Sequence, residues 1–194
     1  TGKTILCALD VRAFNPEKFL FIVHNEGILN RAREEFQKVM PHIDDNEFGL
    51  LTGKHKNVNA KYLFATIKTL SNNENFKAFS KEHFDYIVFD EAHRSAASSY
   101  QRIFNYFTPK FMLGMTATPE RSDDLNIYEL FDYNVAFEIR LQEALESEIL
   151  CPFHYFGVTD YSIGGEISEE VADLKNLTSD ERLQNILDKT NYYG

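Results

Sequence analysis

The chain has 194 residues, of which 43% are hydrophobic, and a chain of this length can bury the core of one ordinary domain. It has no apolar stretch long enough to cross a membrane, and its two cysteines, Cys7 and Cys151, lack the spacing of a metal site or a disulfide framework. The net charge is −10, but residues 1–121 carry 16 basic and 14 acidic side chains, whereas residues 122–194 carry 4 and 16. We therefore expect a protein of a reducing, cytoplasmic compartment with no membrane segment.

The first four residues, Thr1-Gly2-Lys3-Thr4, match the end of a phosphate-binding loop, G-x-x-x-x-G-K-[ST]. In such a loop Lys3 reaches the β- and γ-phosphates of a nucleotide, and the Thr4 hydroxyl is a ligand of Mg²⁺. Gly2, Lys3 and Thr4 are therefore candidate nucleotide-binding residues. The front of the loop and the strand before it are absent, so we expect an N-terminally truncated piece of a longer protein.

Apolar periodicity and turn signals predict alternating helices and strands, which is typical of a mostly parallel sheet flanked by helices. The first helix is predicted from apolar Ile5, Leu6, Leu9 and Phe14, with Cys7 in its core. In chain order the predicted elements are a helix over 4–13, a strand over 19–23, a helix over 26–40, a strand over 48–51, a solvated loop over 52–57, a strand over 62–65, a short helix near 76–79, a strand over 86–89, a helix over 98–107, a strand over 111–115, a helix over 123–131, a strand over 135–139, an acidic helix over 141–150, a strand over 153–158 and a last helix over 178–189.

The strand over 86–89 runs directly into Asp90-Glu91-Ala92-His93. Two carboxylates at the carboxyl end of a buried strand lie where open α/β sheets bind ligands, and a divalent cation there would offset their charge. The alternative is that both acids start a helix, where the helix dipole favours them. If these two acids stood alone, we would prefer the helix start, but two further motifs in the chain favour a site for a divalent cation.

The third motif is Gly114-Met115-Thr116-Ala117-Thr118-Pro119-Glu120-Arg121, which follows the strand over 111–115. With GKT, DEAH and TAT in this order and spacing, the chain resembles the first RecA-like motor domain of superfamily 2 helicases and translocases. The segments DEAHRS and GMTATPER are most similar to restriction-enzyme motor subunits. The resemblance covers about three-quarters of the chain and implies a P-loop fold, ATP and Mg²⁺ as ligands, and DNA or RNA as partner.

The resemblance also implies a role for each motif residue. Asp90 would hold Mg²⁺ through water, and Glu91 would orient or deprotonate the attacking water, with Lys3 neutralising the phosphates. His93 would bridge toward Thr116 and Thr118 and couple the nucleotide state to domain movement. A buried histidine and a strand-end cap are the structural alternatives for these three coupling residues.

Nucleic-acid contacts are expected after two other strands. The resemblance places His24 and Asn25, after the strand over 19–23, and Thr66 and Thr69, after the strand over 62–65, on the backbone of the tracked strand. Each set could instead cap the helix that follows it, and capping does not exclude binding.

The predicted organisation is a RecA-like ATP-binding domain over 1–150 and a connector over 151–194 toward an absent second RecA-like domain in cis. The expected function is ATP-driven movement along nucleic acid, in restriction or repair, with the isolated piece inactive. The alternatives are a P-loop ATPase switch without a nucleic-acid track, and a protein-interaction module that works through the acidic C-terminal segment.

Overall fold

The computed structural model describes residues 2–92, 98–118, 127–147 and 149–151. The chain groups into two compact units, residues 1–136 and 137–194, which are described separately. The domain boundary predicted near residue 150 lies further along the chain and stays a prediction. Within the described ranges, no helix combines the length and the apolar character needed to span a membrane.

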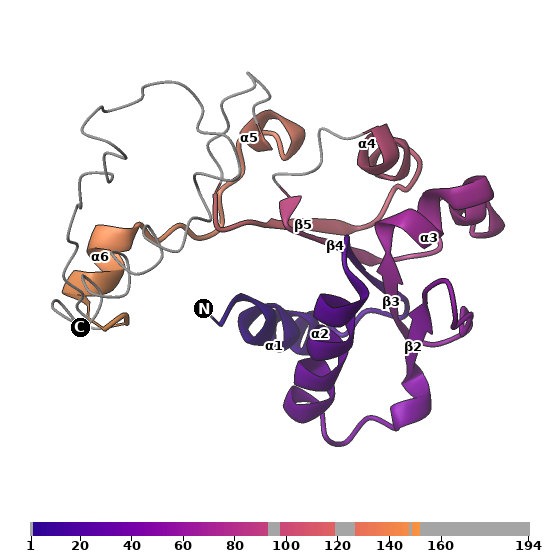
Figure 1. Ribbon diagram of the computed structural model, residues 1–194, viewed down its shortest axis with the longest axis horizontal. Coiled ribbons are helices and arrows are strands. Elements are labelled where there is room, and N and C mark those ends of the chain that lie inside the picture. The colour runs from indigo at the N-terminus through magenta and orange to yellow at the C-terminus, as the bar shows by residue number, and fades with distance from the viewer. Residues whose placement is uncertain (1, 93–97, 119–126, 148, 152–194) are drawn as a thin grey trace, which may run out of the picture. The chain divides into compact units, whose positions relative to one another are not determined.

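The first unit is built on five strands that all run parallel, in the order β2-β3-β1-β4-β5 (Figure 1). Parallel strands in the middle of such a sheet are covered by helices on both faces, which explains why they read as unbroken apolar runs in the sequence. The predicted α/β fold and the five predicted strands up to residue 115 are confirmed. The strands are β1 (Phe19–Val23), β2 (Phe48–Leu51), β3 (Tyr62–Thr66), β4 (Tyr86–Asp90) and β5 (Phe111–Met115).

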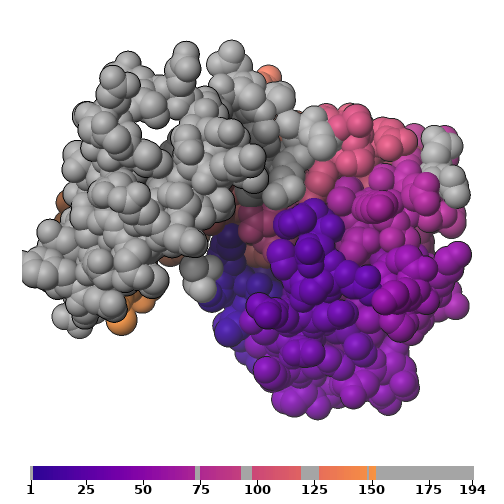
Figure 2. Space-filling view, in the orientation of Figure 1, coloured from indigo at the N-terminus to yellow at the C-terminus, as the bar shows by residue number. Residues whose placement is uncertain are grey.

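Helices cover both faces of this sheet, because successive strand residues point to opposite sides. On one face, Phe19 and Phe21 of β1 belong to a core shared with α1 and α2, which lie side by side (Figure 2). On the other face, Leu20 and Ile22 pack in a core shared with α3, η2 and α4. The helices of this unit are α1 (Lys3–Phe14), α2 (Glu26–Val39), α3 (Ile67–Ser71), α4 (Ser98–Phe104) and α5 (Ile127–Leu130), with 3-10 helices η1 (Asp45–Glu47) and η2 (Asn72–Ala78).

Helix α1 is confirmed, but the large apolar side chains that predicted it face outward. Its buried residues are the smaller Cys7, Ala8 and Val11, which lie on the side toward the sheet. Burial of Cys7 was predicted. The exposed fractions are 46% for Ile5, 56% for Leu6, 39% for Leu9 and 44% for Phe14.

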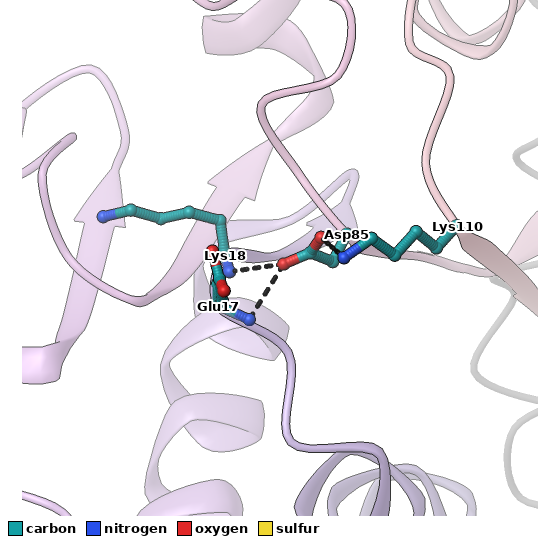
Figure 3. Close-up of polar contacts among 4 residues, drawn as sticks. All are labelled: Glu17, Lys18, Asp85 and Lys110. Carbon is teal, nitrogen blue, oxygen red and sulfur yellow. Dashed lines mark hydrogen bonds and ion pairs between the residues drawn. The ribbon is translucent and has the colours of Figure 1, made fainter.

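Asp85 joins three segments at the amino edge of the sheet (Figure 3). One carboxylate oxygen accepts hydrogen bonds from the backbone N–H groups of Glu17 (2.8 Å) and Lys18 (3.1 Å), just before β1. The other lies 2.7 Å from Nζ of Lys110, just before β5. The Lys110 interaction and the two backbone N–H groups lower the pKa of Asp85, although its burial acts in the opposite direction.

The strand predicted over 135–139 is wrong. After α5 the chain turns through Asp132 and Tyr133, which both have positive φ, and residues 134–140 are irregular. Val135 and Phe137 are 51% and 70% exposed, because no neighbouring strand in the described part of the chain pairs with this apolar run.

Two predicted helices are shorter than expected. In the second unit, α6 (Leu141–Glu146) ends before the predicted residue 150, because the N–H groups of Ile149 and Leu150 both donate to the carbonyl of Ala144. Helix α4 ends at Phe104 rather than at residue 107, and α5 accounts for the described part of the helix predicted over 123–131. The strand predicted over 153–158 and the helix predicted over 178–189 lie outside the described residues.

Candidate functional site

The carboxyl edge of the sheet collects the residues that the sequence motifs single out. Because the strands are parallel and in register, Val23 pairs with Thr66, and Asp90 pairs with Met115. His24, Thr66, Asp90 and Thr116 therefore come at the ends of four neighbouring strands. This is the edge at which open α/β sheets bind ligands.

Asp90 is the most buried charged residue at this edge, with an exposed fraction of 6%. Burial raises the pKa of its carboxyl, and the nearby charge of Glu91 acts in the same direction. The N–H of Glu91 and the charges of Lys3 and His24 oppose this rise. Lys3, Glu91 and His24 therefore all act electrostatically on Asp90, although they come from three different segments.

Glu91 has a left-handed backbone conformation, with φ of 54°. Its N–H donates to Oδ1 of Asp90 at 3.0 Å, so the turn folds the backbone of Glu91 back onto the preceding carboxylate. For a residue with a side chain this conformation costs about 1–2 kcal/mol. The strand thus ends in a strained turn that fixes the two acids relative to each other.

Helix α1 starts at this edge with Lys3, and both Lys3 and Thr4 are partly buried. Gly2 precedes the helix in the left-handed region, with φ of 77°, and its carbonyl accepts the N–H of Leu6 at 3.0 Å. A glycine suits this position because it adopts positive φ without strain. The helix N-terminus presents backbone N–H groups and a partial positive charge, which suit a phosphate.

Two of the residues predicted to contact nucleic acid, Asn25 and Thr66, act as helix caps, which was the alternative considered for them. Oδ1 of Asn25 accepts the N–H groups of Gly27 (2.7 Å) and Ile28 (3.4 Å) at the start of α2. At the start of α3, Oγ1 of Thr66 accepts the N–H of Thr69 at 3.4 Å, and the two threonine hydroxyls lie 2.9 Å apart.

His24 differs from these caps, because its Nδ1 is buried with no hydrogen-bond partner among the described residues. A buried ring nitrogen without a partner is costly and is often explained by a ligand or water. His24 directly follows β1, and the neighbouring parallel strand β4 ends at Asp90, so His24 lies at the same edge of the sheet as the two acids.

The predicted coupling residues follow β5. The hydroxyl of Thr116 accepts the N–H of Thr118 at 3.1 Å, so the two residues form a small turn at the strand end. This matches the strand-end cap that was the alternative for both residues. His93 lies outside the described residues.

One link beneath the site was missed in the sequence. The phenol of Tyr86, at the start of β4, donates to Oδ2 of Asp10 on α1 at 2.5 Å. Burial raises the pKa of Tyr86, and the hydrogen bond to Asp10 adds to this. The two residues are 76 positions apart, and the only signal in the sequence was a carboxylate within the apolar stretch over residues 5–11.

The oxygen atoms of this edge fit Mg²⁺. The hydroxyl of Thr4 and the carboxylate of Asp90 are hard oxygen donors, and burial of Asp90 favours a cation beside it. The described residues contain no group of three or more His, Cys, Asp or Glu side chains that could hold a metal ion. The donor set therefore suits an ion that keeps waters and phosphate oxygens as its other ligands.

A parallel sheet with GKT, DE and TAT residues along its carboxyl edge defines a RecA-like motor domain of superfamily 2 helicases. A family model described as "Type III restriction enzyme, res subunit" matches residues 1–121. The chain therefore belongs to the family of type III restriction enzyme res subunits.

Known proteins with similar sequences include restriction and helicase proteins. A type I restriction enzyme EcoAI endonuclease subunit of Escherichia coli is 30% identical over 115 residues, which are 57% of this chain and 14% of that protein. The putative ATP-dependent helicase IRC3 of Saccharomyces cerevisiae is 24% identical over 174 residues, or 86% of this chain and 23% of that protein. This chain thus spans less than a quarter of the length of either relative.

Solved structures support the same fold. The helicase domain of Hef from Pyrococcus furiosus superposes with a TM-score of 0.58 at 23% identity, over 68% of this chain and 31% of that one. At this identity the likeness concerns the fold, and the predicted RecA-like architecture is confirmed.

Proposed function

We propose that this chain is the nucleotide-binding domain of an ATP-dependent translocase or helicase that acts on DNA in restriction or repair. The observation that carries the proposal is that the buried carboxylate of Asp90 ends β4 at the same sheet edge as His24 and Glu91, and that Lys3 acts on it electrostatically. These groups come from α1, the end of β4 and the end of β1, and only the parallel sheet brings them to one place. Family membership and the motif order support the same function.

Lys3, Thr4 and Gly2 form the nucleotide end of the proposed site. Lys3 neutralises phosphate oxygens, and the N–H groups at the start of α1 add hydrogen bonds to them. Thr4 and Asp90, the latter through water, would hold Mg²⁺, which supplies positive charge to the phosphates. Burial and the N–H of Glu91 keep the Asp90 carboxylate in one position.

Glu91 is the proposed base. Its carboxylate accepts a proton from a water molecule while the water oxygen bonds to the γ-phosphorus, and the bond from that phosphorus to the β–γ bridging oxygen breaks. The products are ADP and phosphate. Because proton transfer by a positioned side chain is worth about 10²–10⁴ in rate, the fixed turn at Glu91 matters for activity.

The remaining site residues would link hydrolysis to movement. His24, Asn25, Thr66 and Thr69 are proposed to contact phosphates of the nucleic acid, since hydroxyl and amide groups often do so. The capping bonds of Asn25 and Thr66 support this role, because they hold those side chains still. We further propose that His93, Thr116 and Thr118 couple the nucleotide state to domain movement.

The whole protein would carry a second RecA-like domain in cis and work in the cytoplasm. The RecA-like domain would extend over 1–150, with 151–194 as connector. The greater length of both relatives supports further domains beyond the matched region.

The test uses the intact protein that contains this chain, with phosphate release measured with and without DNA. Glu91→Gln should lower DNA-stimulated turnover by at least about 100-fold while retaining binding of a fluorescent ATP analogue, and Lys3→Ala should lose that binding. Glu82→Gln makes the same chemical change at an exposed residue at the opposite edge of the sheet and should have no effect. Normal turnover by Glu91→Gln would refute the assigned role. ATP turnover that DNA and RNA leave unchanged would favour an ATPase without a track.

A further inference from the structure

A short connector, residues 79–85, joins η2 to β4 at the amino edge of the sheet, opposite the edge that carries the residues assigned to the nucleotide. Two of its backbone carbonyls bind the segment between α4 and β5. The carbonyl of Phe79 accepts the hydroxyl of Tyr106 at 2.9 Å, and the carbonyl of Lys81 accepts the N–H of Thr108 at 2.9 Å. The connector therefore fastens the start of β4 to the chain that leads into β5.

The ring of His83 contacts two phenylalanines of the same connector. Its centroid lies 5.0 Å from the ring of Phe79 and 4.7 Å from the ring of Phe84, and both phenylalanines belong to the core shared with α3, η2 and α4. Nε2 of His83 is buried there and has no hydrogen-bond partner among the described residues. The ring thus sits in aromatic surroundings that suit its neutral form.

Protonation of His83 would change what these surroundings must hold. A neutral imidazole carries an N–H on one nitrogen only, so Nε2 can stay bare, whereas an imidazolium carries an N–H on both nitrogens. Acid would therefore place a donor at buried Nε2, where the described part of the chain offers no acceptor, and would add a positive charge to the ring. Both changes disfavour the folded arrangement.

The charge nearest in effect opposes protonation as well. Burial above all, and then the charge of Lys18 just before β1, lower the pKa of His83 from its ordinary value of 6.5. Nζ of Lys18 donates to the carbonyls of Asn59 at 2.8 Å and Ala60 at 3.3 Å, which hold this charge in place. No carboxylate in the described ranges lies within ion-pair distance of His83.

The acids nearest in sequence do not compensate. The carboxylate of Asp85 is engaged by two backbone N–H groups and by Lys110 (Figure 3). Glu82 is exposed, and exposed Lys81 beside it has the same sign of charge as a protonated ring. An imidazolium at His83 would therefore gain little from its neighbours.

We propose that the neutral ring of His83 is an acid-sensitive latch, which keeps the connector closed near neutral pH and releases it in mild acid. Release means loss of the connector's hydrogen bonds to Tyr106 and Thr108 while the strands stay paired. Because the folded pKa is lowered, the opened connector binds the proton more readily. The stabilising effect is thus fully present above about pH 6.5 and is lost as the pH falls through the lower folded value.

This latch goes beyond the proposed function, because it involves neither nucleotide nor nucleic acid and is tested without either. The experiment is hydrogen–deuterium exchange of the intact protein, read by mass spectrometry of its peptides from about pH 7.5 to about pH 5.5. Protection factors divide the intrinsic exchange rate by the observed rate, which removes the chemical effect of pH. Protection of the connector and of residues 105–108 should fall below pH 6.5, by up to about tenfold per pH unit, since opening takes up one proton.

Four variants show whether His83 is responsible. His83→Phe keeps an aromatic ring that takes up no proton, so its protection should stay constant over this range. His83→Gln should be constant as well, and it covers the case in which the phenylalanine does not fit. Lys18→Met removes the repelling charge, so acid should cost less protection than in the wild type. His42→Phe, at an exposed residue after α2, is the matched control and should keep the wild-type fall.

Each outcome decides the proposal. A fall confined to the connector and residues 105–108, and absent from both His83 variants, supports the latch. Constant protection in the wild type would overturn it. A wild-type fall that persists in both variants would overturn it too, because another group would then be titrating. An equal fall in α2, on the opposite face of the sheet, would mean that acid acts on the whole unit, which the latch does not allow.

Discussion

The phenol oxygen of Tyr86 lies 2.5 Å from a carboxylate oxygen of Asp10, and this contact ties α1 to β4 beneath the proposed site. Lys3 and Thr4 begin α1, whereas Asp90 ends β4. The hydrogen bond therefore connects the two elements whose ends must meet at the nucleotide. Burial, and then Asp10, raise the pKa of Tyr86, so the phenol keeps the proton that it donates.

Tyr86→Phe should lower the free energy of unfolding by about 1–2 kcal/mol, because a hydrogen bond to a charged group is lost while the ring remains. Urea unfolding followed by circular dichroism measures this change. Tyr62→Phe is the control, since Tyr62 is equally buried and its hydroxyl has no hydrogen-bond partner in the described part of the chain. Equal effects of both changes would mean that the Asp10 contact adds no stability.

The lowered pKa of Asp85 predicts that the free energy of unfolding depends on pH. Its pKa is lowered in the folded protein from an ordinary value of 3.8, so the unfolded chain binds the proton more readily. The stability that it contributes is thus fully present above about pH 4–5 and is lost as the pH falls through the lower folded pKa. At pH 7, Asp85→Asn should cost about 2 kcal/mol, since two backbone N–H groups lose a charged acceptor.

Unfolding midpoints from pH 7 to pH 3 test this expectation. The difference between wild type and Asp85→Asn should shrink below about pH 4, where the wild-type carboxylate takes up its proton. Lys110→Met should have a smaller effect at pH 7, because the Lys110 side chain is 72% exposed. A difference that stays constant over the whole range would show that the charge of Asp85 is unimportant.

Gly114 of β5 has no room for a side chain. A Cβ there would lie 2.5 Å from Cζ of Phe131, whose ring also contacts Phe104 edge-on. Gly114→Ala should therefore cost about 1–3 kcal/mol. Adding Phe131→Leu should restore part of the loss, so the double change should cost less than the sum of the two single changes.

Thermal unfolding of the two single variants and the double variant measures this coupling. Gly53→Ala is the control, because a Cβ there meets no atom within 4 Å, and it should shift stability by less than about 0.5 kcal/mol. Additive costs at Gly114 and Phe131 would mean that the two residues do not compete for space.

The strained turn at Glu91 predicts that two variants that lose activity alike differ in stability. Glu91→Gly and Glu91→Ala both remove the carboxylate, and they differ in how easily they adopt a φ of 54°. Glu91→Gly should be the more stable by about 1 kcal/mol, and both should lose ATP turnover. Differential scanning calorimetry compares them, and a glycine variant less stable than the alanine variant would show that the turn relaxes in solution.

The sheet could be predicted from the sequence because each central strand is buried on both faces and reads as a short apolar run. The same rule failed at residues 135–139, where Val135 and Phe137 are apolar but exposed, since an apolar run forms a strand only beside a partner. In α1, Leu6 and Leu9 correctly indicated a helix. They did not reveal which side is buried, because α1 has apolar side chains on both its outer and its inner side.

The row of candidate residues was predictable for a topological reason: parallel strands end at one edge, and the motifs follow strand ends. The conformation of Glu91 was not predictable, since glutamate has no preference for positive φ. The contact between Tyr86 and Asp10 was also hidden, because it depends on how α1 packs against β4. Local pairs such as Asn25 with Gly27 were visible as capping alternatives, since their partners are near in sequence.

Cys7 is enclosed in the core, where burial above all raises the pKa of its thiol, whereas Cys151 is exposed. A thiol reacts through its thiolate, so Cys7 should resist alkylating reagents while the chain stays folded. A maleimide dye added to residues 1–194 should thus label Cys151 alone, without any cysteine substitution. Residues 1–194 therefore already offer a single attachment point for fluorescence or spin labels, and it lies in the second unit, whereas every residue assigned to the nucleotide belongs to the first.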